Sequence, residues 1–273
     1  MSSESNVLDA DIEHVIASAL QSASDVVYVL DPTPEIVVSL VEVAAGSTSP
    51  PTIRVLADKQ LLKDVMDDFL VASNAADLVA SDTLELRVTA EPIENTLLVT
   101  DSSVVAVVSA GDRVAGLHTD DEAFVEGAND AYSEQFQEAE EFRLRTPAIS
   151  AVRTSLEEDL GEAVRSDFDT VLGLLETVRS DGPGLDEVTI SLLVAAKNDV
   201  LLYDVSKWGE DVGIASKATF SRTKTELEDL GLIETEKVPI DVGRPRLRLR
   251  LGDDRLHDAD PDELVAAARD VLE

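Results

Sequence analysis

Small polar and basic side chains recur along residues 216–230, a segment whose apolar residues have helical spacing. Phe220, Leu227 and Leu230 lie seven and three residues apart, which places them on one helix face that is suited to pack inward. The polar and basic residues fall largely on the other faces, and they are Lys217, Thr219, Ser221, Arg222 and Thr225. Such side chains hydrogen-bond to phosphate oxygens and to base edges in the major groove of DNA.

Two residues mark the ends of this helix. Ser216 is suited to the N-cap position because its hydroxyl can accept a hydrogen bond from an unpaired amide of the first turn. We also count Ser216 among the candidate DNA contacts. Gly231 is expected to adopt the left-handed conformation that often follows the last helical turn. The sequence therefore predicts a helix that begins after Ser216 and ends before Gly231.

Two more helices are expected upstream. Residues 203–212 carry Val205 and Trp208 at helical spacing, and Gly213 then permits a sharp turn. Residues 185–198 supply another apolar helix. A helix, a short turn that contains glycine and a second helix form a helix-turn-helix, which in DNA-binding proteins places its second helix in the major groove.

A basic β-hairpin is expected to follow. Its first strand begins at Leu232, a turn spans 239–243, and arginines alternate with leucines in the returning strand over 246–251. This alternation gives one apolar face and one cationic face. Three helices and a two-stranded wing predict a winged helix-turn-helix domain over residues 185–252, followed by an acidic helix over 253–273.

The four arginines of the wing differ in their distance from the turn. Arg244 and Arg246 lie nearest to it, so we expect them to reach the DNA backbone or the minor groove. Arg248 and Arg250 lie deeper in the strand. They have the alternative of pairing across the hairpin with Glu234 or Glu236.

The distribution of charge supports this interpretation. The chain has 273 residues and a net charge of −34. Residues 1–186 contain 10 basic and 37 acidic residues, whereas residues 187–251 contain 10 and 11. A DNA-binding surface should lack the negative charge that repels phosphates. The acidic, lysine-poor composition indicates a halophilic protein adapted to molar salt, and an acidic mesophilic protein is the alternative.

The N-terminal part has the pattern of an α/β fold. Strands are predicted at 25–31, 52–57 and 84–89, and they alternate with helices at 35–45 and 58–80. A hairpin over 96–109, continued by 113–118, is expected to follow. Residues 1–120 therefore predict an α/β sensor domain with a largely parallel sheet that ends in antiparallel strands.

Residues 121–180 are expected to be a helical connector. Apolar residues recur every three or four positions, which predicts one helix over 121–145 and another from Pro147 toward Arg179. Such stripes either form the core of a domain or build a homodimer interface. DNA-binding regulators that recognise two-fold sites are commonly dimers. We therefore expect a homodimer by one route or another.

The sequence shows no catalytic constellation, and we predict a protein that is not an enzyme and needs no cofactor. His14, His118 and His257 lack metal-ligand spacing, and the chain has no cysteine. No nucleophile elbow or phosphate-binding glycine loop is present. With no apolar run of membrane-spanning length and no signal peptide, the chain is expected to be cytoplasmic.

The sequence resembles the TbsP (TrmB-suppressor) family of haloarchaeal transcriptional regulators along its full length. The most distinctive segments are KWGEDVGIASKATFSRTKTELEDLGLI (207–233) and TEKVPIDVGRPRLRLRL (235–251). The resemblance implies a DNA-binding regulator of central carbon metabolism genes that responds to carbon source. It supplies no catalytic or ligand-binding residues.

Three functions remain open at this point. The leading one is a transcription factor that binds double-stranded promoter DNA, with an N-terminal domain for a small-molecule metabolite effector or for dimerisation. The alternative is a protein-interaction module that uses its winged helix without binding DNA. A recognition surface broken by Glu226, Glu228 or Asp241 favours the interaction module. A polar pocket at the carboxyl ends of the strands near Asp31 and Asp58 favours a third hypothesis, an enzyme with an α/β active site.

Overall fold

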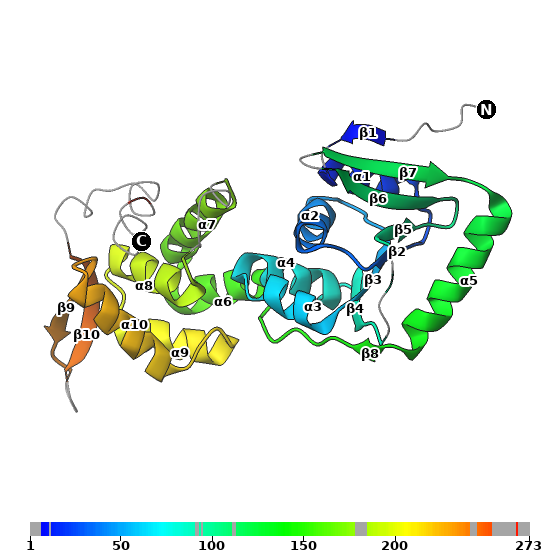
Figure 1. The fold of residues 1–273 in the computed structure, drawn as a ribbon. Helices are drawn as coiled ribbons and strands as arrows, with labels where there is room; N and C mark the ends of the chain where they lie inside the picture. The colour runs from blue at the N-terminus through cyan, green and yellow to red at the C-terminus, as the bar shows by residue number, and fades with distance from the viewer. Residues whose placement is uncertain are drawn as a thin grey trace. The chain divides into compact units, whose positions relative to one another are not determined.

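The chain divides into two compact units, Met1–Ala148 and Ile149–Glu273 (Figure 1). The first is an α/β unit, and the second is helical with a two-stranded sheet. The division falls within the segment 121–180. The computed structural model describes residues 7–10, 12–90, 93, 95–110, 113–177, 185–240, 245–252 and 266.

Among the described residues, eight strands form the sheet of the N-terminal unit in the order β1-β7-β6-β5-β2-β3-β4-β8. The pairs β2–β3 and β3–β4 are parallel. Antiparallel strands extend the sheet on both sides. The predicted α/β class, with a parallel centre and an antiparallel hairpin, is confirmed. The strands β1 to β8 span Val7–Ala10, Val26–Leu30, Thr52–Ala57, Leu84–Val88, Leu97–Val99, Val104–Ala110, Arg113–Thr119 and Glu140–Glu141.

Both faces of this sheet are buried, as the continuous apolar run of β2 requires. Val27 and Val29 pack in the core that contains helices α1 to α4. Tyr28 and Leu30 point to the opposite face, where they pack with α5 (Figure 1). Successive side chains of a strand alternate in this way. Helices α1 to α5 span Ile12–Ser22, Pro34–Ala45, Lys59–Met66, Phe69–Ala80 and Glu122–Glu138.

Strand β1 and helix α1 were not predicted. The polar, acidic start of the chain gave no clear strand signal. Helix α1 nevertheless buries Val15, Ile16 and Leu20 in the core. It therefore belongs to the same layer as α2, which it contacts.

Two predicted helices are interrupted. The prediction of one helix over 58–80 is wrong, because α3 ends at Met66 and the Asp68 carboxylate caps α4 by accepting a hydrogen bond from the Val71 amide at 3.1 Å. The second helical pattern breaks at Gly161, whose φ of +101° separates α6 (Ile149–Leu160) from α7 (Glu162–Thr177). A local cap or a left-handed glycine ends a helix even where the apolar period continues.

Helix α5 also ends earlier than predicted, at Glu138 rather than at 145. The Arg87 guanidinium donates hydrogen bonds to the carbonyl oxygens of Phe136 at 2.8 Å and Gln137 at 2.9 Å. The next two residues pair with β4 as the short strand β8. A cation at the C-terminal carbonyls favours this end point, because it stabilises the negative end of the helix dipole.

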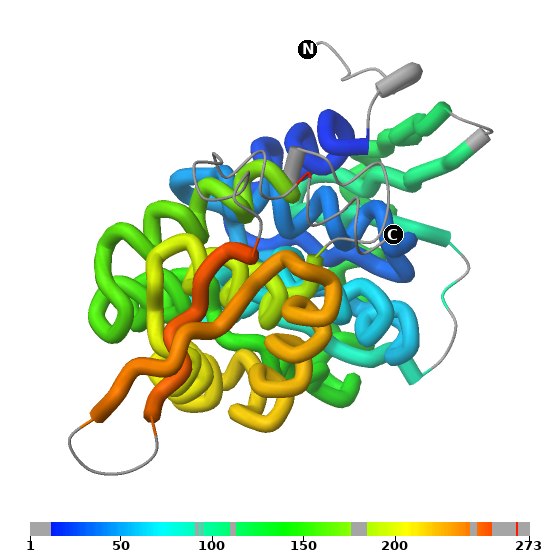
Figure 2. The backbone as a smooth tube through the Cα atoms, turned by 90° about the vertical axis from the view of Figure 1, so that its left-hand side faces the viewer, coloured from blue at the N-terminus to red at the C-terminus, as the bar shows by residue number. Residues whose placement is uncertain are grey.

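The C-terminal unit contains α6 and α7 together with the winged helix (Figure 2). Apolar side chains of α6 and α7 are buried within the chain, so they form core here; they are Val152, Leu156, Val164, Phe168, Val171 and Leu175. The Trp208 indole Nε1 donates to the Ser155 hydroxyl at 2.9 Å, which joins α6 to the winged helix. The remaining elements are α8 (Glu187–Lys197), α9 (Leu202–Val212), α10 (Lys217–Asp229), β9 (Ile233–Val238) and β10 (Arg246–Leu251).

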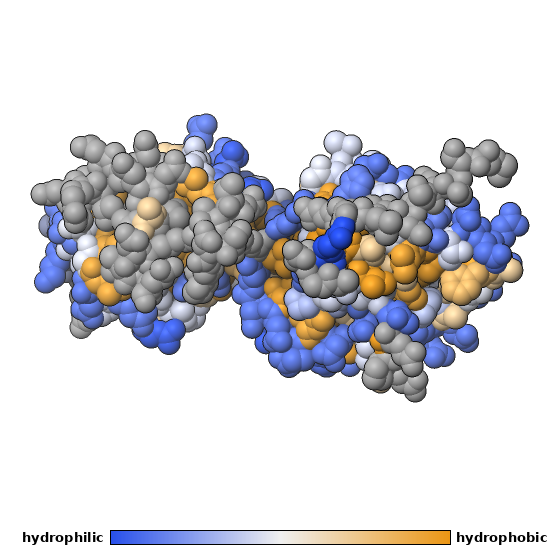
Figure 3. Space-filling view, turned by 45° about the horizontal axis from the view of Figure 1, so that its top comes forward, coloured by the Kyte–Doolittle hydropathy of each residue, from blue (hydrophilic) through white to orange (hydrophobic). Residues whose placement is uncertain are grey.

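Hydrophilic residues cover much of the surface that Figure 3 shows, with hydrophobic residues visible between them. A few large hydrophobic side chains are exposed in the N-terminal unit, including Val108, Leu117 and Phe124. In the part of the chain that the structure describes, every helix is too short or too polar to span a lipid bilayer.

Candidate nucleic-acid interface

Helices α9 and α10 form the predicted helix-turn-helix. Gly213 ends α9 in the left-handed conformation, with φ of +92°. The two helices meet where the Phe220 ring packs on Gly209, and a Cβ atom at Gly209 would lie 2.3 Å from two ring carbons. The absence of a side chain at residue 209 therefore fixes how closely α10 approaches α9.

Both predicted ends of α10 are confirmed. The Ser216 hydroxyl accepts a hydrogen bond from the Thr219 amide at 3.2 Å. Gly231 has φ of +73°. The Gly231 amide donates to the Glu228 carbonyl and the Leu232 amide to the Leu227 carbonyl, both at 3.0 Å. This pair of bonds is a Schellman motif, which satisfies the last carbonyls of the helix.

One face of α10 is exposed along its whole length. Its buried residues are Phe220, Thr223 and Leu227. The exposed residues recur every three or four positions, as expected for one helix face, and they are Lys217, Ala218, Ser221, Arg222, Thr225, Glu226 and Asp229. Four of the predicted contacts, Lys217, Ser221, Arg222 and Thr225, therefore share this face, and Thr219 is half-buried at its side.

The charges on this face are divided between its two halves. Lys217 and Arg222 lie in the N-terminal half, and Glu226 and Asp229 lie in the C-terminal half. The Arg222 side chain is 73% exposed and its Nε lies 3.8 Å from a Glu226 carboxylate oxygen. An ion pair of this length between exposed side chains contributes little, so Arg222 is available to a ligand.

Lys217 is more firmly engaged than Arg222. Its Nζ lies 2.6 Å from a carboxylate oxygen of Glu210 on α9. This hydrogen bond raises the pKa of Lys217 and lowers the pKa of Glu210. Lys217 therefore stays protonated, and part of its charge is offset by Glu210.

The wing has the predicted alternation, and the structure adds its register. Arg246 lies opposite Val238 and Leu251 lies opposite Ile233. Leu249 and Leu251 are buried, whereas Arg246, Arg248 and Arg250 are half-buried. A bridge between Leu201 and Arg248 adds a short third segment to the hairpin. The leucine face of β10 therefore supplies the buried side chains of this strand, and its arginine face is partly exposed.

The described arginines of the wing are all paired with carboxylates. Arg248 and Arg250 lie 3.8 and 2.9 Å from Glu236, which is the cross-hairpin pairing that the sequence left open. Arg250 also lies 3.3 Å from Asp199. The side chains of Arg248 and Arg250 are 37% and 41% exposed, so both remain partly accessible to solvent.

Arg246 is held by two residues of α9 that sequence reasoning missed. Its guanidinium carbon lies 4.1 Å from the centre of the Tyr203 ring, and its Nη1 lies 3.4 Å from an Asp204 carboxylate oxygen. The predicted contact Arg244 and the predicted interrupting residue Asp241 lie outside the described residues. The separation of 42 residues between Arg246 and Asp204 explains why no local pattern indicated this pair.

Glu228, the second predicted interrupting residue, is turned toward the domain. It accepts hydrogen bonds from Lys224 and from the Thr235 hydroxyl at 2.7 Å, which links α10 to β9. Burial works to raise its pKa, but these hydrogen bonds outweigh burial and hold the pKa below its ordinary value. Glu226 is thus the predicted interruption that remains on the exposed face of α10.

Family models match the whole of this architecture. The description "Transcriptional regulator TbsP-like, N-terminal" applies to residues 4–147. The description "Transcriptional regulator TbsP-like, C-terminal HTH domain" applies to residues 148–269. The chain belongs to the TbsP-like family of transcriptional regulators. Membership confirms the resemblance found in the sequence and identifies a DNA-binding regulator of the helix-turn-helix type.

Similarity to other known proteins is low. No curated protein matches the chain significantly. Among solved structures, TrmBL2, an archaeal chromatin protein with a described mode of DNA binding, is 16% identical over 51% of this chain and 54% of its own, with a TM-score of 0.37. The match therefore spans about half of that relative.

Two other solved structures give similar values. Nuc from Salmonella typhimurium, a phospholipase D family member, is 13% identical over 51% of this chain and 95% of its own, with a TM-score of 0.37. NucT from Helicobacter pylori is 13% identical over 50% and 98%, with a TM-score of 0.34. Scores this low carry no functional conclusion, whereas membership in a regulator family favours a role other than catalysis.

Proposed function

We propose that this regulator recognises specific promoter sites by placing the N-terminal half of α10 in the major groove. One observation carries the proposal. Lys217, Ser221, Arg222 and Thr225 share the exposed face of the second helix of a helix-turn-helix, while Phe220 and Leu227 of that helix are buried. The N-terminal residues of such a helix are the ones that contact base edges.

The individual contacts follow from the chemistry of each side chain. Arg222 is the residue suited to a bidentate contact with a guanine, and Ser221 and Thr225 offer hydroxyls to neighbouring bases or phosphates. Ser216, Lys217 and Thr219 lie at the positive end of the helix dipole, where a phosphate is stabilised. Arg246, and Arg244 near the wing turn, would contact the flanking backbone.

The test is a binding titration with promoter DNA. Fragments bound by the protein in cells, mapped by chromatin immunoprecipitation, are titrated with purified full-length chain in buffers of high KCl concentration. The double variant S221A/R222A is expected to bind at least tenfold more weakly, since one good base contact is worth about 1–3 kcal/mol. Arg113→Ala, which removes an exposed arginine from the other unit, is the matched control and should bind like the wild type.

We further propose a homodimer that regulates central carbon metabolism genes in response to a small-molecule effector. Family resemblance motivates the gene class, and the separate N-terminal α/β unit offers a place for an effector. Light scattering gives the molar mass of the purified protein in solution, and a mass of two chains supports the dimer. Genome-wide mapping of bound sites with and without sugar tests the assignment to carbon metabolism genes. Bound promoters unrelated to carbon metabolism would contradict that assignment.

A second function is favoured by the acidic half of the same face. Glu226 and Asp229 are exposed beyond Arg222, so the surface could instead meet a basic protein. The variant Glu226→Ala separates the two functions. DNA binding should be unchanged or tighter in this variant because a repulsive charge is removed, whereas binding of a basic protein partner should weaken.

A further inference from the structure

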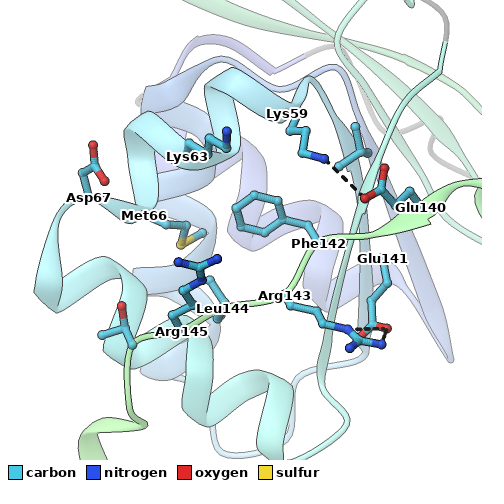
Figure 4. Close-up of a pocket in the computed structure, with 12 residues that line it drawn as sticks. Lys59, Lys63, Met66, Asp67, Glu140, Glu141, Phe142, Arg143, Leu144 and Arg145 are labelled. Carbon is cyan, nitrogen blue, oxygen red and sulfur yellow. Dashed lines mark hydrogen bonds and ion pairs between the residues drawn. The ribbon is translucent and has the colours of Figure 1, made fainter. Parts of the chain in front are cut away.

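A second cationic surface lies in the N-terminal unit, which does not contain the winged helix. A cleft of about 1110 Å³ opens there, lined by residues of α3, the end of β4 and the segment 140–146 (Figure 4). Its lining holds four of the 22 basic residues of the chain, Lys59, Lys63, Arg143 and Arg145. It holds three of the 56 acidic residues, Asp67, Glu140 and Glu141. A chain of net charge −34 therefore has here a cavity wall with a net positive charge.

The fold places this cleft where α/β proteins bind ligands. Lys59 is the first residue of α3, which follows β3 directly, and Val88 is the last residue of β4. The cleft thus lies at the carboxyl ends of two parallel strands, the edge at which open α/β sheets bind small molecules. Neither Asp31 nor Asp58, the residues named for an enzyme pocket, lines it.

Two of the four cations are already neutralised, and two are not. The Lys59 ammonium lies 3.3 Å from Glu140, and the Arg143 guanidinium lies 3.3 Å from Glu141. Within the described residues, neither Lys63 nor Arg145 has a carboxylate or other hydrogen-bond partner. Both side chains are exposed, so they can meet a ligand without breaking an existing pair.

The floor between the free cations is apolar. Phe142, Met66 and Leu144 are half-buried in the lining. In Figure 4 the ring of Phe142 lies between the lysines of α3 and the side chain of Arg145. A cleft with an apolar floor and a few convergent charged groups suits an organic molecule that carries an anionic group. The ammonium of Lys63 and the guanidinium of Arg145 match a phosphate in charge and hydrogen-bond donors.

We propose that this cleft binds a small organic phosphate, with Lys63 and Arg145 on the phosphate and Phe142 against the carbon skeleton. The cleft would then be the binding site of the proposed effector, and the effector would be an organic phosphate. The inference depends on the proposed function only in the claim that binding changes transcription. The binding itself is a property of the N-terminal unit.

Calorimetric titration of the full-length chain tests the proposal with pairs of probes that differ by one phosphate. Glucose 6-phosphate is compared with glucose, and adenosine 5′-monophosphate with adenosine. In at least one pair the phosphate ester should bind at least tenfold more tightly than its uncharged partner, and the pair identifies the skeleton. Absence of binding by both esters, or equal binding of the uncharged compounds, overturns the proposal.

The double variant K63Q/R145Q locates the site. It keeps much of the length of both side chains and removes their charge, and it should weaken binding of the ester at least tenfold. Arg113→Gln, an exposed arginine of the same unit outside the cleft lining, is the control and should bind normally. Unchanged binding by the double variant places the site elsewhere and overturns the assignment.

An NMR titration of the wild-type chain makes the outcome independent of how the variant folds. Amide shifts on addition of the ester should cluster in residues 59–67 and 140–146, and shifts confined to other segments contradict the proposal. Promoter binding is measured on the same protein. Loss of promoter binding with intact ester binding refutes the proposed function alone, and the reverse result refutes the effector site alone.

Discussion

The recognition helix, α10, and the returning strand of the wing, β10, both carry arginines, but these arginines differ in how closely carboxylates pair with them. On α10, Arg222 is 73% exposed and lies 3.8 Å from its nearest carboxylate. On β10, Arg250 is 41% exposed and contacts two carboxylates, one of them at 2.9 Å. Since a guanidinium already bound by carboxylates gains less from a phosphate, the binding free energy should come mainly from α10.

This difference assigns separate roles to the basic residues of α10 and to the arginines of β10. The arginines of β10 hold the hairpin to α9 and to the loop before it, through Asp204 and Asp199. Within the described residues, Arg222 is paired only with Glu226, one turn away on the same helix. We therefore expect the wing to position helix α10, and α10 to contact the bases.

The largest expected effect comes from displacing α10 from α9. Gly209→Ala places a methyl group 2.3 Å from the buried Phe220 ring, so helix α10 must shift. Overpacking of this kind costs about 1–3 kcal/mol of unfolding free energy. Urea denaturation should show this loss, and promoter binding should fall with it.

Gly173→Ala in α7 is the matched control for this change. A Cβ atom at Gly173 meets nothing within 4 Å. Alanine is the better helix former by roughly 1 kcal/mol, so this variant should be as stable as the wild type or more stable. Equal destabilisation of both variants would contradict the packing argument for Gly209.

The next effect concerns the hydrogen-bonded link between α10 and strand β9 of the wing. Glu228→Gln removes the carboxylate that pairs with Lys224, whose side chain is only 11% exposed, and that accepts from Thr235 on the wing. We expect a loss of about 1–3 kcal/mol at pH 7, because a largely buried cation is left without its partner. Urea denaturation of both proteins measures the difference.

The pH dependence of that difference has a defined sign. The pKa of Glu228 is lowered in the folded chain, so its contribution is complete above the unfolded pKa of about 4.3. The contribution is lost as the pH falls through the folded pKa. Wild type and variant should therefore converge between pH 5 and pH 3, and a constant difference over that range would refute the assigned role.

The smallest effect concerns Lys217. Glu210→Gln removes the carboxylate 2.6 Å from its ammonium and frees the lysine for a phosphate. Promoter affinity should rise by a factor of about two to five, in the range of an exposed ion pair. Fluorescence anisotropy measures this change. Weaker binding would show that Glu210 holds Lys217 in its binding position.

The sequence predicted local features well. The α10 caps at Ser216 and Gly231, the alternation of β10 and strand β3 were all correct, because each depends on residues close together in the chain. The breaks at Asp68 and Gly161 were missed since apolar periodicity was given more weight than local capping signals.

The partners of the charged side chains could not be predicted. Arg246 meets Asp204 across 42 residues, and Lys59 meets Glu140 across 81. Only the folded backbone brings these pairs together. The basic lining of the N-terminal cleft could not be predicted for the same reason, because its lysines lie on α3 whereas its arginines follow β8.

The most direct test of the division between recognition helix and wing compares one arginine from each. Promoter DNA is titrated with Arg222→Gln and Arg250→Gln under identical salt conditions, and fluorescence anisotropy gives both dissociation constants. Arg222→Gln should weaken binding at least tenfold, and Arg250→Gln should change it less than threefold. Equal losses, or a larger loss for Arg250→Gln, would contradict the assignment of DNA recognition to α10.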